Sequence, residues 1–227
     1  MKLKSFGCSL IFGTDLPDDG RDGPYPTASQ LTWPALLAKK FGYEYKTFAR
    51  PGAGNLQILE RLLCEINSAD TAVYVIGWTF VDRFDYTNAN SPVKWPGTNW
   101  RTLMPVDTEL IAKKYFSQLH SEYSDKLRTL IYINTAIDCL LRNNCQFIMT
   151  YEDHLTVCQK WHTSTATSML LDRVNPYLKN FEGNGFINWS RINGFEISDT
   201  MHPLAPAHKA AADLVFTEWN QYLCHSA

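Results

Sequence analysis

Long hydrophobic runs are missing from this sequence, and so is any excess of basic residues. No stretch approaches the roughly 18 consecutive apolar residues that a membrane-spanning helix needs, so the sequence predicts a soluble protein. The formal net charge is −2, and Lys and Arg are scattered along the chain. Nucleic-acid binding normally requires clustered positive charge. We therefore expect neither a membrane nor a nucleic acid as a partner.

Paired cysteine motifs are also absent, because none of the six cysteines forms a C-x-x-C pair. Most of them sit inside apolar runs, which favours buried, reduced thiols and a cytoplasmic location. The first residues, "MKLKSFGCSLIFG", contain a short apolar stretch broken by Gly7 and Ser9, without a small-residue cleavage site. This pattern predicts a first strand and not a signal peptide.

What the chain does contain is an alternation of strand and helix patterns. Its 227 residues are 45% hydrophobic, which predicts one domain over residues 1–227. Because strands alternate with helices, we expect a three-layer α/β/α fold with a mostly parallel sheet of about five strands. The expected strands are 2–7, 43–49, 71–78, 145–151 and an extended piece at 185–190, and the expected helices are 29–42, 56–67, two within 107–143, and 205–223.

A long aromatic-rich insertion at about 79–106 follows the third expected strand. Loops of this length in a compact domain are usually functional. Its aromatic side chains, together with Trp78, suit stacking on sugar rings or packing on acyl chains, although aromatic residues also fill protein cores. Arg83 has two readings here, as a partner of nearby aspartates or as a ligand of an anionic substrate group.

Small residues follow three of the expected strands, in the turns Gly7-Cys8-Ser9, Gly52-Ala53-Gly54-Asn55 and Gly77-Trp78-Thr79. The carboxyl ends of parallel strands meet at one edge of a sheet, so these turns should converge. Near the other end of the chain, Asp199 and His202 precede the last helix. A histidine acts as general base only when its tautomer is held, commonly by a carboxylate on Nδ1.

These blocks, "GCS", "GAGN", "GWT" and "DTMHP", resemble the SGNH hydrolases, also called GDSL-like esterases and lipases. The resemblance implies the flavodoxin-like SGNH fold, with Ser9 as nucleophile, His202 as base and Asp199 as the residue that orients it. It also implies an oxyanion hole made by the backbone N–H groups of Ser9 and Gly54.

The sequence departs from the family pattern at two blocks. Cys8 stands where the family usually has Asp, and Thr79 and Phe80 stand where it has Asn and Asp. The second change removes the usual side-chain oxyanion donor, a loss that typically lowers kcat by about 10² to 10³. Asn55 is the expected substitute. Similar variants occur in many phage proteins, so the resemblance also allows a phage origin.

Several of these residues and motifs also have an alternative interpretation, either structural or chemical. Ser9 is a possible helix N-cap, Asp199 a possible cap of the final helix, and Cys8 a possible thiol nucleophile. "GAGN" resembles a dinucleotide fingerprint only in part, because Gln57 replaces its third glycine. The aspartates in the loop that follows Ser9 are expected to be solvated, since their spacing does not match a calcium-binding loop: Asp15, Asp18, Asp19 and Asp22.

The sequence therefore predicts a serine esterase that hydrolyses a small acyl ester, such as an O-acetyl group on a carbohydrate, through an acyl-enzyme. Trp78, Thr79 and Arg83 are the expected substrate-binding residues. The mechanism requires no metal and no organic cofactor. Two alternatives stay open: an O-acyltransferase with the same triad, and a binding or structural protein on this fold that has lost catalysis.

Overall fold

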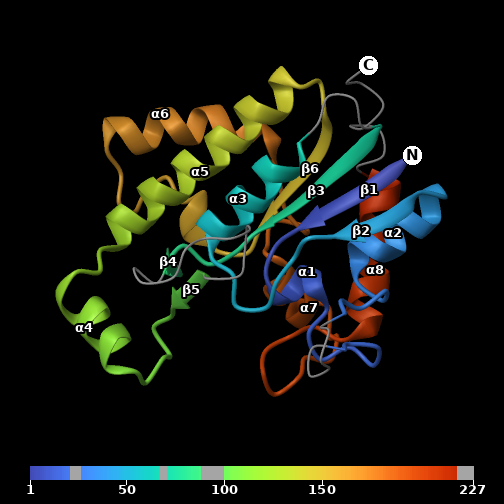
Figure 1. Cartoon of the computed structure of the whole chain (residues 1–227), viewed down its shortest axis with the longest axis horizontal. Coiled ribbons are helices and arrows are strands. Elements are labelled where there is room, and N and C mark those ends of the chain that lie inside the picture. Colours follow the sequence, from blue (N-terminus) through green and yellow to red (C-terminus); the bar gives the residue numbers. More distant parts are fainter. Residues whose placement is uncertain (21–26, 67–70, 88–99, 219–227) are drawn as a thin grey trace.

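A five-stranded parallel sheet forms the centre of the protein (Figure 1). The structure is a computed structural model, and it describes residues 1–20, 27–66, 71–87 and 100–218. Every strand of this sheet pairs in parallel with its neighbours. The carboxyl ends of all five strands therefore lie along one edge. The strand order is β2 (Glu44–Thr47), β1 (Lys2–Phe6), β3 (Ala72–Trp78), β6 (Gln146–Tyr151) and β7 (Leu178–Lys179).

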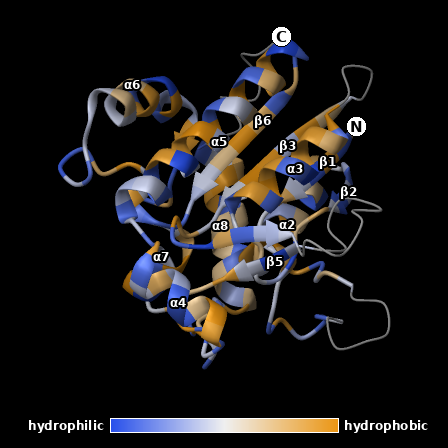
Figure 2. Ribbon diagram, turned by 60° about the vertical axis from the view of Figure 1, so that its left-hand side comes forward, coloured by the Kyte–Doolittle hydropathy of each residue, from blue (hydrophilic) through white to orange (hydrophobic). Residues whose placement is uncertain are grey.

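Helices cover both faces of the sheet, which gives three layers. Strand β3 is buried along its whole length, so successive side chains enter opposite cores. Val73 and Val75 pack with four helices on one face: α1 (Ser9–Phe12), α2 (Trp33–Phe41), α7 (Phe186–Ile192) and α8 (Ala205–Glu218). Tyr74 and Ile76 pack on the other face against α3 (Asn55–Glu65) and α5 (Glu122–Arg142). Figure 2 shows β3 and β6 as hydrophobic ribbons enclosed by these helices. The predicted three-layer α/β/α architecture is confirmed.

The expected insertion contains an antiparallel pair, β4 (Phe84–Thr87) and β5 (Trp100–Leu103). Residues 88–99, the middle of the insertion, lie outside the described residues. Helix α4 (Leu110–Gln118) follows and buries only Ala112. Beyond β6 come a 3₁₀ turn (His154–Thr156), α6 (Thr165–Val174), which packs on α5, and a second 3₁₀ turn (Asn175–Tyr177). The two helices expected within 107–143 are therefore present as α4 and α5.

One secondary-structure prediction is wrong. Residues 185–190, expected to be extended, form most of helix α7, and the fifth strand is instead the short β7. The carboxylate of Glu152, at the end of β6, accepts hydrogen bonds from the N–H groups of Phe186 (2.8 Å) and Ile187 (2.9 Å). These contacts satisfy the first N–H groups of α7, as an N-cap side chain would. A helix start that is stabilised from another element leaves little trace in the local pattern.

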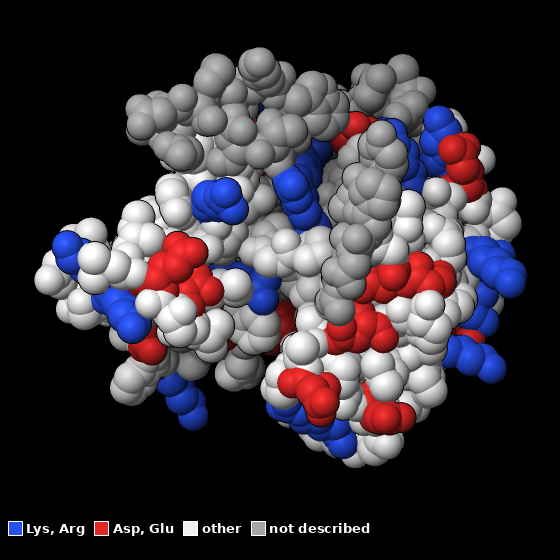
Figure 3. Space-filling model, turned by 60° about the horizontal axis from the view of Figure 1, so that its bottom comes forward, with Lys and Arg blue, Asp and Glu red and all other residues white. Residues whose placement is uncertain are grey.

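Surface features agree in part with the sequence analysis. Among the described residues, no helix is long and apolar enough to cross a bilayer. Figure 3 shows Lys and Arg spread among Asp and Glu on the face in view. All five described cysteines are free, yet only Cys8 and Cys145 are buried, whereas Cys64 is exposed. The expectation of generally buried thiols therefore holds for only part of the set.

Candidate active site

Ser9 lies at the carboxyl end of β1, where the chain turns directly into helix α1. The extended backbone of Cys8 makes this turn, and Ser9 is the first helical residue. Gly7 is required by close packing, because an added Cβ would lie 2.4 Å from Cγ1 of Ile11. Ser9 is buried but reaches a neighbouring loop. Cys8 is enclosed in the hydrophobic core on the α2–α8 side of the sheet, which disfavours it as the nucleophile.

His202 lies on the loop between α7 and α8 and meets Ser9. Its Nε2 atom is 2.9 Å from Ser9 Oγ, although the two residues are 193 positions apart in the chain. A tight turn holds the histidine: the Ser198 N–H donates to the His202 carbonyl (2.9 Å), and the His202 N–H donates to Ser198 Oγ (3.1 Å). The predicted pairing of Ser9 with His202 is therefore present as a contact within hydrogen-bond distance.

The carboxylate beside His202 belongs to Asp15. His202 Nδ1 lies 2.8 Å from Asp15 Oδ2. Helix α1 ends at Gly13 with a φ of 88°, and Asp15 itself has a φ of 69°. These two left-handed residues turn the chain back toward the serine. For a residue other than glycine this conformation costs about 1–3 kcal/mol, so the surroundings must hold Asp15 in place.

Two hydroxyl groups provide part of that hold. Ser198 Oγ donates to Asp15 Oδ2 at 2.7 Å, and Thr200 Oγ1 donates to the same oxygen. The side chains of Asp15 and His202 are each 15% exposed. A carboxylate in this position favours the tautomer with the proton on Nδ1, which leaves Nε2 free to accept the serine proton.

Asp199 is the first correction to the expected site. It lies at the exposed corner of the turn from Ser198 to Met201, which is closed by a hydrogen bond from the Met201 N–H to the Ser198 carbonyl (2.9 Å). Within the described part of the chain, Asp199 makes no hydrogen bond and no ion pair. The turn directs the Nδ1 side of His202 toward the loop after α1, so Asp15 takes the place expected for Asp199.

The expected oxyanion donors are a second correction. The N–H of Gly54 donates to Asp85 Oδ1 at 3.0 Å. The amide nitrogen of Asn55 is used twice, donating to the Thr79 carbonyl (3.3 Å) and to Thr129 Oγ1 (3.2 Å). Because Asn55 Nδ2 has only two hydrogens, none is left for a substrate. By contrast, the Ser9 N–H has no acceptor among the described residues.

The three expected substrate-binding residues are occupied in packing. Trp78 is 1% exposed and Thr79 is fully buried. The Thr79 N–H donates to Asn55 Oδ1 at 2.8 Å, so Asn55 and Thr79 join the start of α3 to the end of β3. Arg83 is half-buried and donates to the Ala53 carbonyl at 3.1 Å. Trp78 and Thr79 are therefore buried at the end of β3 and closed to a substrate, and Arg83 supports the turn before α3.

A second histidine, His208, is buried in α8, the helix that follows the His202 loop. His208, in α8, accepts a hydrogen bond at Nδ1 from the Trp33 N–H (3.0 Å) and is 1% exposed. Burial, and to a smaller extent the charge of nearby His202, lower the pKa of His208 to about 3, so His208 is neutral at physiological pH. This contact joins the first residue of α2 to the helix that follows His202.

Sequence reasoning missed Asp15 and Asp85. The sequence predicts a solvated loop for Asp15, and the signal that could have identified it is its closeness to Ser9 along the chain, which places it at the same sheet edge. Asp85 gave no signal, because it reaches α3 from a different element. Among the residues that the structure describes, no group of three or more His, Cys, Asp or Glu side chains is arranged to hold a metal ion.

Comparison with known proteins identifies the fold. No family model matches the sequence, and no curated protein matches it. Solved structures do match. A carbohydrate esterase, whose active site is described as having divergent catalytic and non-catalytic binding functions, is 16% identical with a TM-score of 0.54, covering 97% of this chain and 68% of its own.

Two further structures match over nearly their full length. The psychrotrophic esterase EstA from Pseudoalteromonas sp. is 11% identical with a TM-score of 0.54, over 99% of both chains. TesA is 13% identical with a TM-score of 0.52, over 95% of this chain and 96% of its own. The chain therefore has the SGNH hydrolase fold, as its sequence blocks predict.

Proposed function

We propose that this protein is a serine esterase that hydrolyses a small acyl ester through Ser9, His202 and Asp15. The observation that carries the proposal is the continuous contact from Ser9 Oγ to His202 Nε2 and from His202 Nδ1 to Asp15 Oδ2, at 2.9 and 2.8 Å. Nucleophile, base and orienting carboxylate within hydrogen-bond reach define a catalytic triad by geometry and not by position in the sequence.

The chemistry follows from this geometry. Ser9 Oγ attacks the ester carbonyl carbon while His202 Nε2 takes the hydroxyl proton. His202 returns that proton to the leaving alcohol, and an acyl-enzyme remains on Ser9. Water then attacks the acyl group with His202 again as base, releasing the carboxylic acid. Asp15 stabilises the imidazolium formed in both steps.

The Ser9 N–H is the oxyanion donor that the described residues leave free. Since each missing donor typically lowers kcat by about 10² to 10³, we expect slow hydrolysis compared with an esterase that has a full set. The likeness to a carbohydrate esterase supports a carbohydrate ester as the substrate class, and an O-acetyl group is the small acyl group that we propose for it.

Active-site labelling tests the proposal. The purified protein is incubated with an ethylphosphonate ester that carries a p-nitrophenolate leaving group, which Ser9 Oγ would displace from phosphorus, and with a chromogenic acetate ester. EstA is described as inhibited by a monoethylphosphonate. We expect phosphonylation of Ser9, read by peptide mass spectrometry, together with ester hydrolysis that Ser9→Ala abolishes. Cys8→Ala is the matched control and should retain both. Labelling at Cys8, or hydrolysis that survives Ser9→Ala, would overturn the assignment.

A second candidate function is a carbohydrate-binding or structural role without turnover. The engagement of Gly54 N–H by Asp85 and of Asn55 by Thr79 and Thr129 favours it. Labelling, hydrolysis and oligosaccharide binding, measured on the same protein, distinguish the esterase from the binding role. A protein that binds an acetylated oligosaccharide with equal affinity before and after Ser9→Ala, and that neither hydrolyses it nor reacts with the phosphonate, would support the binding role.

A further inference from the structure

Lys126, in helix α5, is a buried cation without a counter-charge. It is 1% exposed, and its Nζ donates to two backbone carbonyls, those of Cys158 (2.5 Å) and Trp161 (2.6 Å). Among the described residues, no carboxylate lies within 4 Å of Nζ. Lysine is almost never fully buried unless it is paired, because an unpaired charge loses its hydration. Carbonyl dipoles replace part of that hydration but supply no opposite charge.

A cavity lies beside this lysine, in the space between α5 and α6. Its volume is about 260 Å³, and its lining is polar apart from Cys158 and Leu171. The cavity opens to solvent, because four of its polar lining residues are exposed: Gln159, Thr163, Ser168 and Asp172. Lys126 and Asp172 contribute opposite charges, while Gln159, Thr163 and Ser168 offer groups that both donate and accept hydrogen bonds. The third hydrogen of the Lys126 ammonium has no acceptor among the described residues. Burial lowers the pKa of Lys126, as expected for a cation that lacks an anion.

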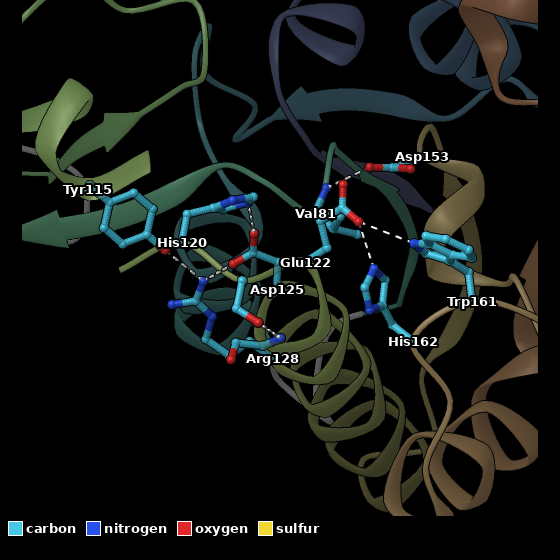
Figure 4. Close-up of polar contacts among 11 residues, drawn as sticks. Val81, Tyr115, His120, Glu122, Asp125, Arg128, Asp153, Trp161 and His162 are labelled. Atoms are coloured by element: carbon cyan, nitrogen blue, oxygen red, sulfur yellow. Dashed lines mark hydrogen bonds and ion pairs between the residues drawn. The ribbon is translucent and has the colours of Figure 1, made fainter. Parts of the chain in front are cut away.

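The loop that Lys126 contacts has other anchors. Glu122, in the first turn of α5, lies 2.6 Å from His162 Nε2 and accepts a hydrogen bond from Trp161 Nε1 (3.2 Å), as Figure 4 shows. Tyr123 Oη lies 3.0 Å from Ser164 Oγ. Because these contacts already hold the loop to α5, a buried charge is not needed to keep it in place.

We propose that this cavity is a binding site for a small hydroxylated carboxylate, of the size of a sugar acid. The ligand carboxylate would lie in the cavity beside Lys126 and offset the cost of its unpaired charge through the field of the ammonium, because the buried Nζ is not open to direct contact. Ligand hydroxyl groups would bond to Thr163, Ser168 and Gln159 and donate to the Asp172 carboxylate. Asp172 disfavours a dianion such as phosphate, since the second negative charge gains no partner. The site lies outside the Ser9–His202–Asp15 group and does not depend on the esterase proposal.

Calorimetric titration of the full chain with D-glucuronate tests this site. We expect saturable binding with a Kd of about 1 mM or tighter, and at least tenfold weaker binding of glucose, which lacks the carboxylate. Inorganic phosphate should also bind at least tenfold more weakly than glucuronate. Tighter binding of phosphate would overturn the ligand class, and the absence of glucuronate binding would overturn the site.

Three variants locate the binding. Lys126→Met should weaken glucuronate binding at least tenfold, whereas the matched control Lys113→Met, on the exposed side of α4, should leave it unchanged. Ser168→Trp fills the cavity while keeping Lys126, and it should abolish binding even if Lys126→Met fails to fold. Unchanged affinity in a folded Ser168→Trp protein would show that the ligand binds elsewhere. Ester hydrolysis by Ser9 is not the readout, so its loss would not affect the result.

Discussion

At the scale of single residues, the choice between Asp15 and Asp199 defines the proposed mechanism. Asp15 contacts His202 Nδ1, and its strained backbone is held by the loop that also carries the histidine. Asp199 faces solvent a short distance along that same loop. A carboxylate can orient an imidazole only through direct contact, so the two aspartates should have very different effects on the reaction rate.

We expect Asp15→Asn to lower kcat for a chromogenic acetate ester by about 10³ to 10⁴, because an amide at this position favours the wrong histidine tautomer. Asp199→Asn should change kcat by less than about threefold, as an exposed substitution away from the contact. Steady-state kinetics with both variants, each checked for a native circular dichroism spectrum, makes the comparison. A large loss in Asp199→Asn with normal activity in Asp15→Asn would restore Asp199 as the residue that orients His202.

At the scale of elements, the β4–β5 pair stabilises the start of α3. Gly54 is the N-cap of that helix but has no side chain to accept hydrogen bonds. Asp85 replaces it by accepting from the N–H groups of Gly54 and Gln57, each at 3.0 Å. Gln57 Nε2 and Thr102 Oγ1 also donate to the carboxylate, at 2.8 and 2.7 Å. The insertion thus fixes the turn that the sequence analysis placed in the active site.

Asp85→Ala should lower the free energy of unfolding by about 1–3 kcal/mol, because buried N–H groups at the helix start lose their acceptor. Gly54→Ala should destabilise to a similar degree for a different reason, since its Cβ would lie 2.5 to 2.7 Å from atoms of the Asp85 carboxyl group. Urea unfolding measures both. Asp199→Asn, in an exposed turn, is the control with no expected change. Wild-type stability in Asp85→Ala would show that water caps α3 equally well.

At the scale of the whole molecule, the sequence predicts the architecture better than the site. The continuous apolar run of β3 and the glycine turns after β1 and β2 are local signals, and they placed Ser9 at the correct edge. The contact between Asp15 and His202 spans 187 positions, and the cap that Glu152 places on α7 spans 34. Such pairings depend on how loops pack after the sheet has formed. This explains why the sequence pattern points to Asp199 beside His202 and to an extended segment at 185–190.

His208, which is buried, and Glu152, which is half-buried, give the folded state opposite responses to pH. Burial lowers the pKa of His208 from 6.5 to about 3, so between these values only the unfolded chain binds the proton and stability rises with pH. Burial raises the pKa of Glu152 from 4.5 to about 7, so in that range only the folded chain binds the proton and stability falls as pH rises. Between about pH 4.5 and 6.5 the two contributions cancel.

Removing either group should reveal the other. Relative to the parent protein, Glu152→Gln should make the free energy of unfolding rise by about 1.4 kcal/mol more per pH unit between pH 4.5 and 6.5, because His208 then acts alone. His208→Gln should change the slope by the same amount in the opposite direction. Urea unfolding at several pH values measures the slopes, and comparison with the parent removes contributions from other groups. Loss of a hydrogen bond lowers stability equally at every pH. A variant whose free energy of unfolding is lower than that of the parent by the same amount at every pH would therefore show that the replaced group has no shifted pKa. Slope changes of opposite sign in the two variants, each relative to the parent, would establish that both groups do.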